Sequence, residues 1–177
     1  LVLTDVKLCC YSVPAALRLL GPRRPERFSQ VATLIGKAGL AGVTRSIGRS
    51  CTVDDSVYLG DSMGELMTFY AAADVAFVGG SLVPRIGGHN LLEPARCGKP
   101  VLHGPHMENF LEISRLLNKA GASRRVANQG EPLSSLETLF LDQPSGHKMG
   151  RNGQLMVERN AGATLKTLER IRPFLRG

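Results

Sequence analysis

The sequence predicts an α/β protein in which parallel β-strands form a sheet with helices on both faces. Short apolar runs with strand character alternate along the chain with longer amphipathic segments of helical spacing. Strand–helix–strand units give parallel strands, because each helix carries the chain back before the next strand begins. With 177 residues, the chain has the length of one domain, since domains commonly have about 100–200 residues. We therefore expect a single domain over residues 1–177.

Periodicity and capping residues predict the elements of the first half. Ser29 can cap a helix whose apolar residues have helical spacing, and Gly39 can end it. Asp61 or Ser62 can cap the next helix, which is rich in strong helix formers. In chain order we expect a helix over residues 29–40, strands over 42–48 and 56–61, a helix over 63–73 and a buried strand over 74–80.

The second half repeats the pattern. A helix that ends on Gly98 precedes a short apolar strand, and the following helix is amphipathic, with Phe110, Ile113, Leu116 and Leu117 on one side. In chain order we expect a helix over residues 89–98, a strand over 99–105, a helix over 109–121, a strand over 123–128, and helices over 132–142 and 149–175.

The charge balance favours an anionic partner. Lysine and arginine number 22 against 15 aspartates and glutamates, for a formal net charge of +7. Nucleic acid, phosphorylated small molecules and anionic membrane surfaces all attract such a chain. The basic residues are scattered, and three tyrosines and six phenylalanines without tryptophan offer no stacking platform for single strands. We therefore expect no nucleic acid, whereas contact with an anionic membrane surface stays open.

Cysteine spacing and hydropathy exclude several further classes. Cys9, Cys10, Cys51 and Cys97 form no CxxC pair, so neither a zinc site nor a disulfide framework is expected. We expect no metal and no cofactor. No apolar run reaches the roughly 18 residues that span a bilayer, so the chain is expected to be soluble. The absence of an initial methionine and the early apolar segment suggest a piece of a longer chain.

A glycine-rich loop follows the apolar run VAFV (residues 75–78) and resembles a phosphate cradle. Gly79, Gly80 and Ser81 stand where a strand leads into a loop, and ligands of open α/β sheets bind at the carboxyl ends of strands. Glycines let backbone amides approach an anion, and a helix start adds partial positive charge. The spacing differs from G-x-G-x-x-G, so the ordinary dinucleotide fingerprint is not met.

Asn90 and Glu93 allow two interpretations. Three residues apart on a helix, they share one face, where a carboxylate can accept hydrogen bonds from ribose hydroxyls and an asparagine can donate to phosphate. The same spacing resembles a capping box, in which both residues serve only the helix start. His89 can act as an acid, bind phosphate or occupy a turn.

The stretches GPRRPERF, GDSMGELMTFYAAADVAFVGGSLVP and GGHNLLEPARCGKPVLHGPHMENF closely resemble the C-terminal half of the 3-deoxy-D-manno-octulosonic acid (Kdo) transferases of Gram-negative bacteria. The resemblance covers about residues 19–175. It implies a Rossmann-like domain that forms the C-terminal, CMP-Kdo-binding half of a GT-B glycosyltransferase. Such enzymes transfer Kdo without a metal to a lipid A precursor at the cytoplasmic face of the inner membrane. The N-terminal half, which carries the catalytic base and the acceptor surface, has no counterpart in this chain, so the chain alone is expected to be inactive.

The resemblance also implies which residues hold the donor. An arginine contacts phosphate, the MGE segment borders the cytosine, the GGS loop lies near the phosphate, and the HNLLE element serves phosphate and ribose. These donor-binding residues are Arg23, Met63, Gly64, Glu65, Gly79, Gly80, Ser81, His89, Asn90 and Glu93. The loop before His89 is one residue longer than the family pattern, with Ile86 or a neighbour as the extra residue.

Two other functions are compatible with these features. A GT-B domain that uses a UDP sugar would share the same phosphate-binding logic, and competition between CMP and UMP would distinguish it. A non-catalytic basic domain that binds nucleic acid or anionic membrane would instead show affinity that falls steeply with salt.

Overall fold

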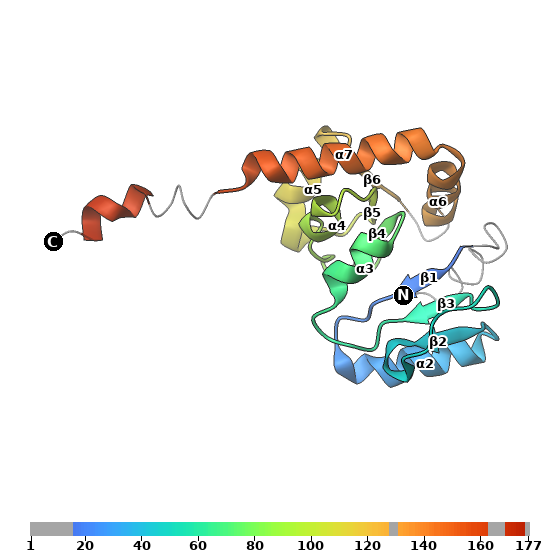
Figure 1. The fold of residues 1–177 in the computed structure, drawn as a ribbon. Coiled ribbons are helices and arrows are strands. Elements are labelled where there is room, and N and C mark those ends of the chain that lie inside the picture. Colours follow the sequence, from blue (N-terminus) through green and yellow to red (C-terminus); the bar gives the residue numbers. More distant parts are fainter. Residues whose placement is uncertain (1–15, 128–130, 163–168, 176–177) are drawn as a thin grey trace.

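The computed structural model describes residues 16–127, 131–162 and 169–175, and its strands are all parallel (Figure 1). The described strands form two three-stranded sheets, with the orders β1-β3-β2 and β4-β5-β6. In the first sheet Leu20 pairs with Leu59, and Leu59 with Thr44; in the second, Val78 pairs with His103. The strands are β1 (Arg18–Leu20), β2 (Gly42–Thr44), β3 (Val57–Leu59), β4 (Ala76–Val78), β5 (Val101–His103) and β6 (Ser123–Arg125).

Helices connect and cover the strands. In Figure 1, α2 lies along the lower side of the first sheet, α7 crosses the top of the molecule, and residues 169–175 lie away from the body. The α-helices are α2 (Phe28–Lys37), α3 (Leu66–Ala72), α4 (Leu92–Arg96), α5 (Leu111–Lys119), α6 (Glu131–Leu141) and α7 (Gln143–Asn160). Short 3₁₀ helices are η1 (Pro25–Arg27), η2 (Arg45–Ile47), η3 (Glu108–Phe110) and η4 (Arg172–Leu175).

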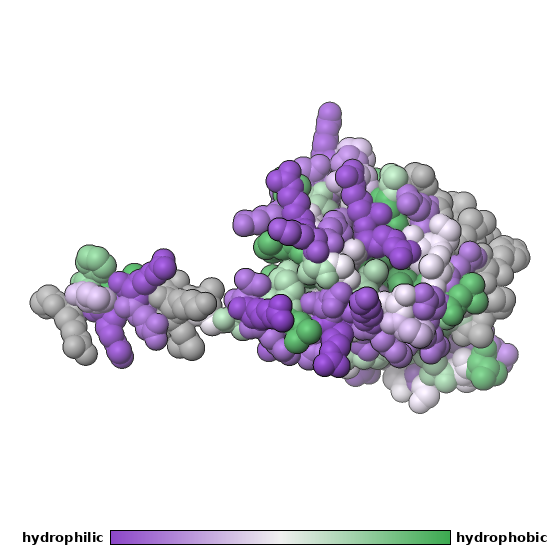
Figure 2. Space-filling model, turned by 90° about the horizontal axis from the view of Figure 1, so that it is seen from above, coloured by the Kyte–Doolittle hydropathy of each residue, from purple (hydrophilic) through white to green (hydrophobic). Residues whose placement is uncertain are grey.

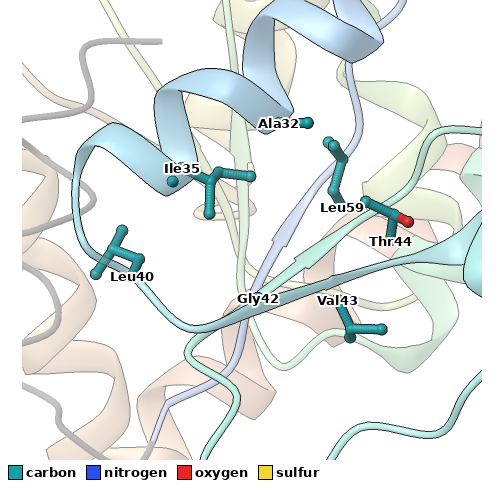
Figure 3. A pocket seen from close by; sticks show the side chains of 8 residues that line it. Ala32, Ile35, Leu40, Gly42, Val43, Thr44 and Leu59 are labelled. Carbon is teal, nitrogen blue, oxygen red and sulfur yellow. The ribbon is translucent and has the colours of Figure 1, made fainter.

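The first sheet packs its core against α2. Val31 and Ile35 of that helix meet Leu20, Val57 and Leu59 of the strands. A gap of about 170 Å³ lies between α2 and strands β2 and β3, and Figure 3 shows the side chains that line it. Its lining is apolar or glycine except for one threonine, Thr44. This gap therefore lacks the polar groups that a nucleotide requires.

The second sheet has the larger core and is covered on both faces. All residues of β5 are buried, although successive side chains of a strand point to opposite faces. Leu117 of α5 and Met156 of α7 pack into the same cluster as Val101. Helix α7 approaches closely because Gly150 lies against the carbonyl of Gly98, where a side chain would collide. Figure 2 shows the upper face of the molecule, over α7, as mainly hydrophilic.

The predicted alternation of parallel strands and helices is confirmed, whereas several boundaries are wrong. Ser29 does not cap α2: its N-cap is Arg27, because η1 runs directly into the helix from Pro25. The segment predicted as a strand over residues 42–48 is strand only to Thr44, and η2 then ends at Gly48, which has a left-handed φ of 75°.

Three further differences concern helices. Neither Asp61 nor Ser62 caps α3, which begins at Leu66 after the N-cap Glu65. Of the four residues expected on one side of α5, Leu117 is buried and Phe110 and Ile113 are partly buried, whereas Leu116 is 46% exposed. The helix predicted over residues 149–175 is instead α7, which starts at Gln143 and ends at Asn160.

Some sequence predictions lie outside the described residues, among them those for Cys9, Cys10 and residue 128. Strand β1 was not predicted at all, because its three residues lack a periodic signal. Across the parts of the chain that are described, no helix combines the length and apolarity needed to cross a membrane.

Candidate functional site

A groove opens at the carboxyl ends of β1 and β3, where open α/β sheets bind ligands. Its volume is about 200 Å³. The turn after β1, the turn after β3 and the start of α3 form its walls. The lining residues are Gly21, Pro22, Arg23, Gly60, Ser62, Met63, Gly64, Leu66 and Phe69. The fold thus brings together Arg23, Met63 and Gly64, which the sequence placed in two separate motifs.

The carboxylate of Glu65 is turned toward η2. Arg45 donates to its Oε1 from Nε at 3.2 Å and from Nη2 at 3.1 Å, and the hydroxyl of Ser62 donates to Oε2. These hydrogen bonds, that of Ser62 foremost and then those of Arg45, hold the pKa of Glu65 below its usual value. Glu65 is therefore ionised at neutral pH, and both of its oxygens already have partners within the protein.

The glycine loop after β4 has free space beside Gly79 but not beside Gly80. A Cβ added to Gly79 would meet nothing within 4 Å, whereas Gly80 has a left-handed φ of 79° and lies under the side chain of Ile86. Ser81 is fully buried. Its hydroxyl donates to the carbonyl of Val78 at 2.6 Å and accepts from the amide of Gly104 at 2.8 Å. The side chain of Ser81 thus ties the loop to the end of β5.

Arg23 and His89 join the groove to the glycine loop. Nη1 of Arg23 lies 3.1 Å from Nδ1 of His89. Burial lowers the pKa of His89, and the nearby charge of Arg23 lowers it further. His89 is therefore neutral at pH 7. Because a guanidinium can only donate, Nδ1 accepts and the ring proton lies on Nε2. Nε2 is 3.5 Å from the position that a Cβ on Gly80 would take, so the N–H is placed at the loop.

Asn90 and Glu93 make the contacts of a modified helix cap. Oδ1 of Asn90 accepts from the backbone amide of Leu92 at 3.0 Å, and its Nδ2 lies 3.3 Å from Oε1 of Glu93. The N-cap position itself is Leu91. One oxygen of Glu93 and one donor hydrogen of Asn90 remain for other partners after these two bonds. The predicted capping box with Asn90 as N-cap is therefore wrong, although Asn90 does bond to the first turn of α4. A binding role stays a prediction.

Tyr70 also belongs to this region, although the sequence gave no reason to select it. Burial raises the pKa of Tyr70 to about 12, and the negative charge of Glu93 acts in the same direction. Arg23 acts in the opposite direction, so all three side chains lie within electrostatic reach of one another. The tyrosine hydroxyl is therefore protonated at neutral pH and can donate a hydrogen bond.

The loop before His89 contains left-handed backbone. Arg85 has a φ of 70°, and Gly87 and Gly88 follow with φ of 78° and 67°. The side-chain amide of Asn109 donates to the carbonyl of Ile86 at 3.2 Å and anchors the loop. His89 lies beside Gly80 in this arrangement.

Six groove residues were missed by sequence reasoning: Gly21, Pro22, Gly60, Ser62, Leu66 and Phe69. All but Phe69 lie within or beside GPRRPERF and GDSMGEL, so proximity to those motifs was an available signal for them. Gly60 is required because a side chain there would collide with the ring of Phe69. Within the described ranges, His, Cys, Asp and Glu side chains form no group of three that could hold a metal ion.

Parallel sheets with a groove and a glycine loop at their carboxyl ends define a Rossmann-like α/β domain, of the type that forms one half of a GT-B glycosyltransferase. A solved structure supports this class: the C-terminal CMP-Kdo binding domain of WaaA from Acinetobacter baumannii superposes with a TM-score of 0.83 and 29% sequence identity. The match covers 88% of this chain and 81% of that one. No family model matches the chain.

Two of the curated relatives are 3-deoxy-D-manno-octulosonic acid transferases. That of Haemophilus influenzae is 40% identical over 163 residues, and that of Bordetella pertussis is 38% identical over 165 residues. These alignments include 92% and 93% of this chain, which spans 38% of the length of each relative. The chain thus resembles part of the Kdo transferases in sequence and the C-terminal domain of WaaA in structure, as its motifs predicted.

Proposed function

We propose that this chain is the donor-binding half of a glycosyltransferase that transfers Kdo from CMP-Kdo to a lipid A precursor. The names of its relatives and the ligand named for the structural neighbour support this proposal. Residues 1–177 would form one donor domain, and a second domain would supply the acceptor surface and the catalytic base. The parent enzyme would act at the cytoplasmic face of the inner membrane. Alone, the chain would bind the donor weakly and transfer nothing.

The observation that carries the proposal is the arrangement around Gly79. Open space lies over this glycine, the Nε2–H of His89 lies by Gly80, and Arg23 contacts the other nitrogen of the same imidazole. A neutral N–H donor beside a fixed cation favours an anion such as the phosphate of CMP. The contact between Arg23 and His89 would let one ligand bind the groove and the glycine loop together.

The remaining parts of a nucleotide have matching surfaces. Met63 and Gly64 line the groove and would border the cytosine. Glu93 has one carboxylate oxygen that no described residue uses, and it would accept hydrogen bonds from the ribose. Glu65 would not offer the ligand a carboxylate oxygen as Glu93 does, because its carboxylate is bound by Arg45 and Ser62.

Such binding would contribute to transfer in two ways. Holding the nucleotide fixes the anomeric carbon of Kdo in front of the acceptor, which removes much of the entropic cost of their encounter. Arg23 and the backbone amides of the glycine loop would stabilise the negative charge that develops on the departing CMP phosphate. No described residue is assigned as the base, since that role is expected in the other half.

An NMR titration of the chain with CMP, and with UMP for comparison, tests the proposal. We expect saturable amide shifts over residues 63–65 and 79–93 with CMP and weaker ones with UMP. Gly79→Ala should abolish the CMP shifts while the protein stays folded, because the added methyl occupies only the open space. Gly36→Ala, at a glycine in α2 whose Cβ position is also open, is the matched control and should bind CMP like the parent.

The outcome separates the alternatives. Equal shifts with UMP would favour a UDP-sugar transferase. Binding to nucleic acid or anionic vesicles that falls steeply with salt, together with no CMP shifts, would favour a non-catalytic basic domain. Unchanged CMP binding by Gly79→Ala would contradict the assigned phosphate position.

A further inference from the structure

The turn between β3 and α3 has two sides. Asp61 and Glu65 carry carboxylates that bond to η2, and neither residue lines the groove. The other residues of the turn face the groove: Gly60, Ser62, Met63, Gly64 and Leu66. The turn that forms this wall of the groove is thus attached to another element through residues that do not line the groove.

That attachment consists of two consecutive residues of η2. Arg45 makes its two hydrogen bonds to Oε1 of Glu65. Ser46 donates to Asp61 from its backbone amide at 2.8 Å and from its hydroxyl at 2.5 Å. The turn is therefore held at Asp61 and Glu65, four residues apart in the sequence, and the groove-lining residues lie between or beside these points.

Other hydrogen bonds restrain the ends of the turn: the amide of Gly60 donates to the carbonyl of Leu20 at 2.8 Å, and the hydroxyl of Ser62 donates to Glu65. Between these ends, Met63 is 61% exposed, and Gly64 has a φ of 84°, in the left-handed region that glycine enters freely. The hydrogen bonds to Asp61 and Glu65 therefore restrain the two residues from both sides. The charges needed for the Arg45–Glu65 pair are present at neutral pH, because the hydrogen bond to Glu65 raises the pKa of Arg45, and hydrogen bonds from Ser62 and then from Arg45 lower the pKa of Glu65.

We propose that Arg45 is a positioning residue for the nucleotide: acting through Glu65, it holds Met63 and Gly64 in the geometry that receives the base. The inference rests on the proposed function, since it assumes that the groove binds the base of CMP. Arg45 does not line the groove, and its guanidinium bonds to Glu65. Loss of Arg45 would let the turn move and would weaken binding without removing a ligand contact.

The test compares CMP affinity among Arg45→Gln, Glu65→Gln and the double variant, measured by titration. Each single substitution should raise the dissociation constant about tenfold, and the double substitution should raise it by the same factor rather than by about a hundredfold. Such non-additivity is expected only if both residues act through one contact. Amide shifts of Met63 and Gly64 without ligand should change alike in all three variants.

Arg49→Gln is the matched control. Arg49 donates to both carboxylate oxygens of Asp55, at 2.7 and 2.6 Å, in the segment that follows η2. Removing it breaks an ion pair of the same chemistry away from the groove, so CMP affinity and the Met63 and Gly64 amides should stay unchanged.

Additive losses, or an Arg45→Gln variant that behaves like Arg49→Gln, would overturn the inference. CMP binding by the unsubstituted chain distinguishes failure of the proposed function from failure of the positioning role. If the parent fails to bind CMP, the proposed function fails. In that case unchanged Met63 and Gly64 amides in ligand-free Arg45→Gln still refute the positioning role, and changed amides sustain its structural part.

Discussion

Arg23 and His89 are 66 residues apart in the sequence, yet Nη1 of the arginine lies 3.1 Å from Nδ1 of the histidine. The contact joins the turn after β1 in the first sheet to the loop after β4 in the second. It also selects the tautomer of the histidine, because a guanidinium has no acceptor. One side-chain contact thus links the groove with the glycine loop and places a neutral N–H donor at the loop.

Removing Arg23 should raise the pKa of His89. Burial is the larger cause of its lowered pKa and would remain, but the repulsion from Arg23 would be lost. NMR titration of the His89 ring in Arg23→Gln measures this directly. Arg24→Gln should give a smaller rise, since Arg24 is the weakest of the named influences. Equal effects of the two substitutions would contradict the contact.

Gly104→Ala should destabilise the protein by about 1–3 kcal/mol, the usual cost of overpacking. The added methyl would collide with the backbone at Ser81 and lie 2.8 Å from the amide nitrogen of Leu82, and backbone cannot rotate away. Urea unfolding measures the effect. Gly79→Ala, in the same loop region but with open space around it, should change the free energy of unfolding little. Similar losses at both positions would show that the loop is packed differently.

The local features of this fold could be predicted from the sequence. Gly39, Gly98 and Gly121 were each expected to end a helix, and each has a left-handed φ just beyond one. Such endings depend on a single residue and its immediate neighbours, because glycine enters this region without steric cost. The order of strands and helices could be predicted for the same reason, since periodicity is a local property.

The partners of polar side chains could not be predicted. Ser81 was expected near phosphate, but its hydroxyl bonds to Val78 and Gly104, the latter 23 residues away. Glu65 was expected at the cytosine, and its carboxylate bonds to Arg45 in another element. A motif identifies a residue type at a position, whereas the direction of its side chain depends on contacts distant in sequence. Whether these residues also touch a ligand stays a prediction.

Stability should fall as the pH is lowered below about 6.5, the usual pKa of histidine. His103 is buried, its Nδ1 lies 2.8 Å from the carbonyl of Gly104, and its Nε2 lies 3.3 Å from the amide of Asn118. Burial lowers its pKa in the folded protein. Between the folded pKa and 6.5, the unfolded chain binds a proton that the folded chain does not, so acidification favours unfolding.

The slope for one such proton is at most about 1.4 kcal/mol per pH unit. Urea unfolding between pH 7.5 and pH 5 measures it, above the range where most carboxylates titrate. His89 has a lowered pKa as well and contributes with the same sign. His103→Gln should therefore reduce the slope without abolishing it. A slope that is unchanged by His103→Gln would mean that His103 does not titrate in this window.

Two substitutions at Asn90 can separate helix capping from nucleotide binding. Asn90→Ser keeps an oxygen near the amide of Leu92, whereas Asn90→Ala removes it and should cost about 1 kcal/mol of stability. Both variants lack the side-chain amide that now reaches Glu93 and that we expect to donate to phosphate. The alanine variant should therefore be the less stable one by urea unfolding, while both should lose CMP affinity to the same extent. If Asn90→Ser binds CMP like the parent chain, Asn90 serves only the start of α4, because the remaining hydroxyl can replace the cap but not a donating amide at that distance.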